Sequence, residues 1–206
     1  MKSRLTALTM TLALVFLAAT SSLAVKMLFE DQFATFDPSW GVSSERIHVD
    51  NGKLIINGEP KIAFNYLNQT GVLPNDMEAS FTMSFVKAEE PTYGSGLLFW
   101  ARDYRAWYCL LINPNGWFAV QRFDGGHFIL PVPWRESDVI AKGEGRVNQV
   151  KVATKGDEAT VFINGEKVIS FTGFPPQDGS LIGFRETSGP YGSNSVAFSD
   201  LKVVQP

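Results

Sequence analysis

The chain has 206 residues, of which 45% are hydrophobic and 19% are charged, and its formal net charge at pH 7 is −3. This length and composition suit one globular domain with a sizeable core. The mild acidity argues against nucleic acid or an anionic membrane surface as a partner, because both carry dense negative charge.

The first 24 residues have the pattern of a secretory signal peptide. Lys2 and Arg4 precede an apolar run over residues 5–19, and Ser22-Leu23-Ala24 places small residues at a cleavage site. The apolar run is shorter than the ~20 residues that a membrane-spanning helix needs, and no other stretch is apolar for that long. We therefore expect cleavage after Ala24, a secreted or periplasmic protein, and no membrane span.

Cys109 is the only cysteine, so the chain cannot form an internal disulfide. It lies inside an apolar run, and we predict that it is a small residue of the core or of a sheet face rather than a reactive thiol. A signal peptide on a chain without disulfides favours a bacterial source.

From residue 25 onward, hydrophobic residues come in short runs that turn signals separate every ten or so residues. This spacing is typical of an all-β sandwich. Clear hairpin turns stand at Asp50-Asn51-Gly52, Asn113-Pro114-Asn115-Gly116 and Asn164-Gly165. The predicted strands, in chain order, cover residues 27–33, 53–56, 78–85, 97–102, 107–112, 117–123, 149–153, 159–163, 167–171, 180–185 and 195–204.

Residues 25–206 contain no helical period of ten or more residues, and only residues 138–142 are predicted to form a short helical turn. That turn lies within a predicted long loop, residues 125–143. The expected fold class is all-β: a single domain over residues 25–206 that forms a two-sheet antiparallel jelly-roll sandwich. Its first and last strands are expected to lie side by side.

Three segments carry a family resemblance: residues 96–103 (Gly-Leu-Leu-Phe-Trp-Ala-Arg-Asp), residues 107–116, and residues 148–165. With the opening residues 30–33 and the closing residues 198–203, they resemble the concanavalin A-like lectin and glucanase superfamily of jelly rolls. The superfamily includes lectins, laminin-G-like binding modules, endo-β-glucanases and a bacterial group named for 3-keto-disaccharide hydrolysis. These motifs are strand and turn patterns, so the resemblance implies the fold and leaves the function open.

Glucanase chemistry is disfavoured by the residues themselves. The glucanases of this superfamily carry Glu-x-Asp-x-x-Glu on a central strand, because two carboxylates must flank the scissile bond. The corresponding strand here, residues 107–112, contains no acid. Other hydrolase signatures are also missing from the sequence. Glu136, Asp138 and Glu186 are the acids that would favour an enzyme if the structure placed them in a cleft.

A candidate binding face follows from the alternation of side chains along three predicted strands. Leu97, Phe99 and Ala101 suit the core, which leaves Trp100 and Arg102 on the opposite face. The same alternation adds Trp107 and Gln121, with Trp117 as a further candidate. Aromatic rings stack on sugar rings, while Arg and Gln bond to hydroxyl groups. Alternatively, the tryptophans pack beneath loops such as residues 125–143.

Three more residues are placed near this face by their position after a late strand. Arg185 is predicted to bind ligand at the rim, and Glu186 and Tyr191 adjoin it. Trp134 lies in the predicted loop and suits either binding or packing. The predicted ligand-binding residues are therefore Trp100, Arg102, Trp107, Gln121 and Arg185.

A structural calcium ion is implied by the resemblance, since superfamily members often hold one away from the cleft. Asp31 and Asp200 sit in the two terminal strands and offer carboxylate oxygens. The alternative is that both are ordinary edge-strand acids or turn caps. No other cofactor is expected.

Three functions remain open on the sequence. The first is a secreted, carbohydrate-binding module-like protein that uses its concave sheet face. The second is a glycoside-cleaving enzyme of the 3-keto-disaccharide hydrolase type. The third is an extracellular structural or adhesive module that binds a protein partner.

Overall fold

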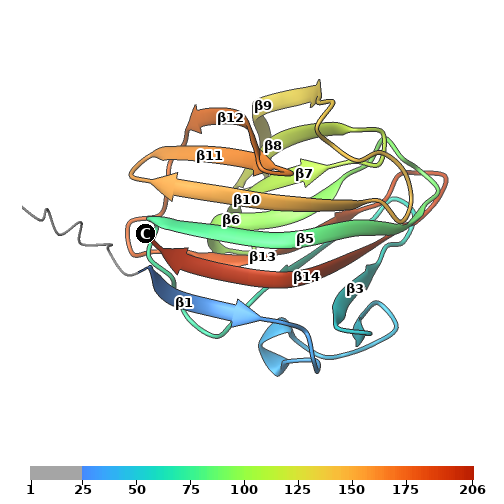
Figure 1. Ribbon diagram of the computed structural model, residues 1–206, viewed down its shortest axis with the longest axis horizontal. Coiled ribbons are helices and arrows are strands. Elements are labelled where there is room, and N and C mark those ends of the chain that lie inside the picture. Colours follow the sequence, from blue (N-terminus) through green and yellow to red (C-terminus); the bar gives the residue numbers. More distant parts are fainter. Residues whose placement is uncertain (1–24) are drawn as a thin grey trace, which may run out of the picture.

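The computed structural model describes residues 25–206. The predicted signal peptide, residues 1–24, lies outside the described residues. Two antiparallel sheets pack face to face in a sandwich (Figure 1). The only helical element in residues 25–206 is a single 3-10 turn, η1 (Pro38–Trp40), and nothing there forms a helix long and apolar enough to cross a bilayer.

One sheet has eight strands in the order β12-β11-β10-β5-β14-β3-β2, and β1 also pairs with β14. The strand β1 follows β3 along the same edge of β14, so the first and last strands lie side by side as predicted. The strands of this eight-stranded sheet are β1 (Lys26–Asp31), β2 (Ile47–Asp50), β3 (Lys53–Asn57), β5 (Met77–Ala88), β10 (Val147–Lys155), β11 (Glu158–Ile163), β12 (Glu166–Thr172) and β14 (Asn194–Gln205).

The second sheet has six strands in the order β4-β13-β6-β7-β8-β9. The strands β6, β7 and β8 follow one another both in this sheet and in the chain, whereas β13 comes from near the C-terminus. The strands of this six-stranded sheet are β4 (Ala63–Leu67), β6 (Ser95–Asp103), β7 (Ala106–Ile112), β8 (Trp117–Asp124), β9 (His127–Glu136) and β13 (Leu181–Thr187).

The core lies between the two sheets and is built from alternating residues of each strand. In β5, alternate residues from Met77 to Phe85 are buried, as the alternation predicts. Phe184 of the six-stranded sheet stacks on Phe198 of the eight-stranded sheet, with ring centroids 4.0 Å apart. Burying one such phenylalanine contributes about 1.5–3 kcal/mol, so aromatic contacts between the sheets stabilise the sandwich strongly.

The predicted hairpin turn between β7 and β8 is confirmed, and the polar side chain of Asn113 explains it. Its Oδ1 accepts hydrogen bonds from the backbone N–H groups of Asn115, at 3.1 Å, and Trp117, at 3.0 Å. Gly116 has φ +88, a backbone conformation that favours glycine. The turn therefore sets the register that places β8 beside β7.

Two predictions about the connecting segments are wrong. Residues 125–143 are not a long loop, because β9 covers residues 127–136, and residues 138–142 form a turn without a helix. Pro131 and Pro133 obscure the strand in the sequence. Both prolines are tolerated because β9 is the edge strand of its sheet. One side of this strand has no neighbouring strand, so a missing N–H group on that side removes no hydrogen bond between strands. The strand β4 was not predicted either.

The alternation also fails at one residue of β6, and this changes a predicted site residue. Trp100 has φ +46, and the pairing of β6 with β7 shifts register between Phe99 and Asp103. The irregularity turns Trp100 toward the core and Ala101 toward the outer face, the reverse of the prediction. Trp100 is 2% exposed there. Regular alternation holds only where the ladder is unbroken.

Candidate functional site

The outer face of the six-stranded sheet, which points away from the core, carries a second apolar cluster. In register across the strands, Leu98 of β6 lies beside Cys109 of β7, which lies beside Gln121 of β8. The buried members of this outer-face cluster are Leu67, Leu98, Ala101, Trp107, Cys109 and Leu111. These side chains are 0–4% exposed, so the cluster is a floor against which neighbouring side chains such as Trp134 pack.

Arg185 of β13 crosses this face. It is paired in register with Gly96 of β6, and a side chain at Gly96 would collide with the carbonyl oxygen of Leu110. Because glycine leaves the neighbouring strand bare, the guanidinium of Arg185 reaches across it and stacks over Trp107 of β7, 4.8 Å from the ring centroid. The sequence thus places a cation at the middle of the sheet rather than at its rim.

A hollow of about 540 Å³ opens beside Arg185, and we call it the Arg185 hollow. Its walls come from β7, β8, β9 and β13 and from the loops before β4 and β6. The residues that line it include Lys61, Tyr93, Leu111, Gln121, Trp134 and Arg185. Tyr93 is 38% exposed, and Trp134 is half-buried, so aromatic surface is available to a ligand.

Polar atoms around this hollow lack partners. Gln121 Oε1 and Arg185 Nε, on two residues that line it, are buried and make no hydrogen bond; the same holds for Trp107 Nε1, on the same sheet face but outside the lining of this hollow. Nη1 of Arg185 donates to Asn65 Oδ1 at 2.5 Å. Buried polar groups are normally bonded, so three unpartnered atoms on one face call for a bound group that satisfies them.

Burial shifts the pKa values of two ionisable groups on this face. Burial lowers the pKa of Arg185 and raises the pKa of the Cys109 thiol to about 12, so this cysteine is a neutral sheet-face residue, as predicted, and not a nucleophile. No Asp or Glu lines the Arg185 hollow in the described part of the chain.

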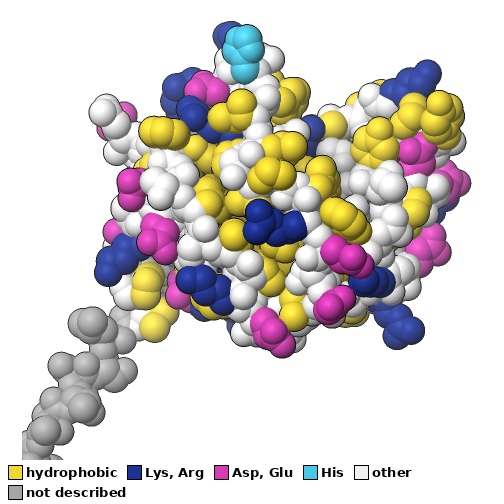
Figure 2. Space-filling view, turned by 90° about the horizontal axis from the view of Figure 1, so that it is seen from above, with side chains coloured by type: hydrophobic (Ala, Val, Ile, Leu, Met, Phe, Trp, Pro, Cys, Tyr) yellow, Lys and Arg dark blue, Asp and Glu magenta, His cyan; other side chains and the backbone are white. Residues whose placement is uncertain are grey.

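A second hollow, of about 400 Å³, lies near the turn between β6 and β7, and we call it the Trp100 hollow. Tyr108 and Phe174 flank Arg122, whose guanidinium lies 5.6 Å and 5.1 Å from their ring centroids. Arg122 also pairs with Asp124 at 2.6 Å. Figure 2 looks onto the side where β9 and β12 lie, and it shows apolar side chains gathered there with basic groups among them.

The five predicted ligand residues therefore divide between the two hollows. Gln121 and Arg185 line the Arg185 hollow, whereas Trp100, Arg102 and Trp107 line the Trp100 hollow. The stack of Arg185 on Trp107 joins the two. The prediction that all of the first four share one sheet face is corrected, because the irregularity in β6 moves Trp100 inward.

The remaining candidates lie elsewhere. Glu186 is fully buried on the core side of β13, Glu136 pairs with Lys142 at 2.7 Å, and Tyr191 is 94% exposed outside both hollows. Trp117 and Asp138 line neither hollow. Sequence reasoning missed Asn65. The alternation of side chains in Ala63-Phe64-Asn65-Tyr66-Leu67 could have indicated this residue, because it places the Asn65 amide on the outer face.

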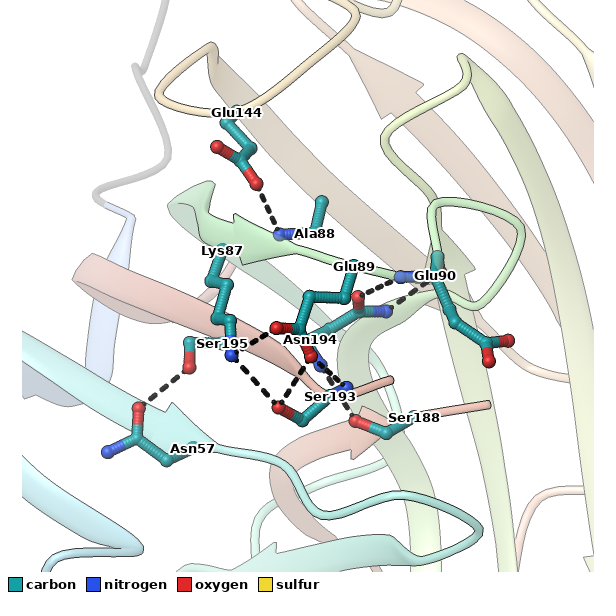
Figure 3. Close-up of polar contacts among 10 residues, drawn as sticks. All are labelled: Asn57, Lys87, Ala88, Glu89, Glu90, Glu144, Ser188, Ser193, Asn194 and Ser195. Atoms are coloured by element: carbon teal, nitrogen blue, oxygen red, sulfur yellow. Dashed lines mark hydrogen bonds and ion pairs between the residues drawn. The ribbon is translucent and has the colours of Figure 1, made fainter. Parts of the chain in front are cut away.

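A polar network fixes the loops that form one rim of the Arg185 hollow (Figure 3). Asn194 is fully buried; its Oδ1 accepts from Glu90 N at 3.1 Å and its Nδ2 donates to Glu90 O at 3.1 Å. Beside it, Glu89 accepts from Ser193 N at 2.7 Å and pairs with Lys87. Hydrogen bonds from Lys87 and Ser193 lower the pKa of Glu89 to about 2.

We expect Asn194→Ala to destabilise the protein by roughly 1–3 kcal/mol, because it leaves buried groups of the Glu90 backbone without partners. Urea unfolding of the variant and of the unaltered protein measures this difference. Asn115→Ala, at an exposed turn position, is the matched control and should change stability little. Equal midpoints for both variants would contradict a structural role for Asn194.

The predicted calcium ligands have different hydrogen-bond partners. Asp31 Oδ1 accepts from Phe33 N at 2.7 Å, and Oδ2 accepts from the buried Trp40 indole at 2.8 Å. Asp200 instead accepts from its neighbour Ser199 and lines a hollow on the outer face of the eight-stranded sheet. Residues 25–206 hold no group of three His, Cys, Asp or Glu suited to a metal, and a calcium site built from the two carboxylates with backbone carbonyls stays a prediction.

No protein-family model matches the sequence, and a comparison with curated proteins finds no match. Solved structures do resemble it. A Bacillus subtilis protein of unknown function with a galectin-like fold aligns with a TM-score of 0.64 at 12% identity, over 87% of this chain and 96% of that one.

Two further similar structures have names that state a function. The catalytic domain of an endo-1,3-beta-glucanase (laminarinase) from Thermotoga petrophila has a TM-score of 0.61 at 10% identity, over 87% of this chain and 97% of that one. Carbohydrate-binding module CBM66 from Bacillus subtilis has a TM-score of 0.52 at 11% identity, over 79% of this chain and 89% of that one. At such identities the likeness shows the fold alone, a two-sheet antiparallel jelly-roll sandwich.

Proposed function

We propose that the protein is a secreted carbohydrate-binding protein and that it binds sugar at the Arg185 hollow. The observation that carries the proposal is the pair of buried, unpartnered polar atoms on Gln121 and Arg185, beside open aromatic surface. A sugar ring presents both hydroxyl groups and an apolar face. It therefore satisfies polar atoms and covers aromatic rings at once.

The fold supports this choice among the functions that the sequence leaves open. Solved structures with the same fold include one that is named as a carbohydrate-binding module. The predicted signal peptide would deliver the protein to where polysaccharides are found. Both points are consistent with sugar binding, and the chemistry of the hollow is what favours it over a protein-binding role.

Binding is favoured over cleavage. Glycoside hydrolysis needs two carboxyl groups on either side of the scissile bond. The Arg185 hollow has none among the described residues, and Glu136 and Glu186 lie away from it. We propose a non-catalytic module for this reason.

Trp134→Ala tests the proposal after a glycan-array screen has identified a ligand for the purified protein. Losing roughly 60 Å² of apolar contact at about 25 cal/mol per Å² should weaken binding about tenfold. Isothermal titration of the variant with that glycan measures the loss, at a temperature well below its melting point, because Trp134 also packs against the outer-face cluster and its removal costs some stability.

Trp117→Ala is the matched control. It makes the same substitution on the same sheet, at a tryptophan that is 39% exposed and lines neither hollow. Its affinity should be unchanged. An array without any bound glycan, or equal losses in the two variants, would overturn the proposed site.

A further inference from the structure

We infer that the Arg185 hollow selects an acidic saccharide and that Arg185 binds the carboxylate of a uronic acid; this rests on the proposed function. The hollow contains an isolated cation beneath the surface of a chain whose net charge is negative.

Arg185 is a buried cation without a counter-charge. It is 7% exposed, and arginine is almost never buried to this degree unless it is paired. Its partners in the protein are the amide of Asn65 and the ring of Trp107, both neutral. None of the ion pairs found in residues 25–206 includes it. An anionic ligand would supply the missing charge.

The groups around Arg185 do not supply a full counter-charge. Glu186 is the next residue in the chain but lies on the core side of β13. Burial raises its pKa to about 7, although the charge of Arg185 lowers it, so the carboxyl is only partly ionised at neutral pH. The Cys109 thiol, with its pKa raised to about 12, carries no charge at neutral pH. The charged side chains that line the hollow are Lys61 and Arg185, both cationic. The hollow is thus positive on a chain whose net charge is −3.

The geometry favours a carboxylate on a sugar over a simple anion. Trp107 covers one face of the guanidinium, and the buried Nε has no protein partner, so a planar carboxylate that enters from the hollow would meet a donor that the protein leaves unused. Gln121 Oε1 is an unpartnered acceptor and needs a donor such as a hydroxyl group. A uronic acid carries both groups on one ring.

Paired glycans test the inference on the unaltered protein. The probes are hexasaccharides of polygalacturonate, polymannuronate, polyguluronate and glucuronan, each titrated beside its carboxyl-reduced counterpart, which has the same linkages and no charge. We expect at least one acidic form to bind ten times more tightly than its reduced form or better. We also expect this advantage to shrink as salt rises. A sulfated, carboxyl-free galactan serves as the second anionic arm.

Arg185→Gln should remove the advantage of the acidic form, so that the acidic glycan and its reduced counterpart bind with similar affinity. Lys61→Gln, at an exposed position of the same hollow, should weaken only the acidic form and by less. If Arg185→Gln fails to fold, the paired glycans and Lys61→Gln still decide.

The outcomes separate the inference from the proposed function. Equal binding of acidic and reduced glycans overturns the acidic selectivity and leaves sugar binding standing. Binding of the sulfated galactan, without binding of any uronate, also overturns the selectivity for a uronic acid and leaves sugar binding standing. Binding of neither charged nor neutral glycans, here and in the array, overturns the proposed function itself.

Discussion

Trp100→Ala is expected to lower the free energy of unfolding by roughly 3–5 kcal/mol, the usual cost of deleting a buried tryptophan side chain. The indole is 2% exposed and packs against Phe99, Tyr108 and Phe171, with ring centroids 5.5, 5.4 and 6.4 Å away. In a domain of this size the melting temperature should fall by roughly 6–20 °C. Thermal unfolding followed by circular dichroism measures it.

Trp117→Ala again provides the comparison, because a tryptophan that is 39% exposed loses much less burial when truncated. Trp100 also lines the Trp100 hollow, and its predicted role in ligand binding remains a separate prediction. A small stability loss at Trp100, similar to that at Trp117, would show that the inward orientation in β6 is wrong.

Stability should fall as the pH rises from 5 to 8, because of Glu186. Its carboxyl is fully buried, Oε1 accepts from the Ser188 hydroxyl at 2.8 Å, and Oε2 has no partner. Burial raises its pKa in the folded protein from 4.5 to about 7. Between these values the folded state holds a proton that the unfolded state has lost. The stabilisation is therefore full below pH 4.5 and is lost as the pH rises through 7.

The expected loss between pH 5 and pH 8 is roughly 2–3 kcal/mol, since each pKa unit corresponds to about 1.4 kcal/mol. Glu186→Gln cannot ionise and should remove most of this pH dependence. Melting temperatures of the two proteins at pH 5 and pH 8, at constant ionic strength, give the comparison. Glu136→Gln is the control, because Glu136 is exposed and paired with Lys142. The same slope in the unaltered protein and in Glu186→Gln would rule out a buried neutral carboxyl.

The fold was accessible from the sequence where strands are regular and pair with their neighbours in the chain. The strands β7 and β8 follow one another through a strong turn, so simple alternation places Trp107 and Gln121 on the outer face correctly. Alternation fails in β6, because an irregular backbone at Trp100 leaves no mark in the order of polar and apolar residues.

The centre of the candidate site was harder to predict for a different reason. Arg185 lies on β13, which joins the six-stranded sheet beside β6 although more than seventy residues separate them. Pairing over such a distance is decided by packing of the whole sandwich, and local patterns do not report it. The sequence therefore indicated Arg185 as a rim residue, whereas the fold places it beside Gly96, over the middle of the sheet.

Pro131 and Pro133 in β9 also bear on self-association. Phe128, Ile129 and Leu130 of the same strand are 55%, 51% and 44% exposed, and an apolar edge strand invites an extra strand from another molecule. A proline has no N–H group, so two positions of this edge cannot donate to an incoming strand. The two prolines thereby protect the sheet against growing into aggregates at β9, although apolar side chains lie exposed near this edge.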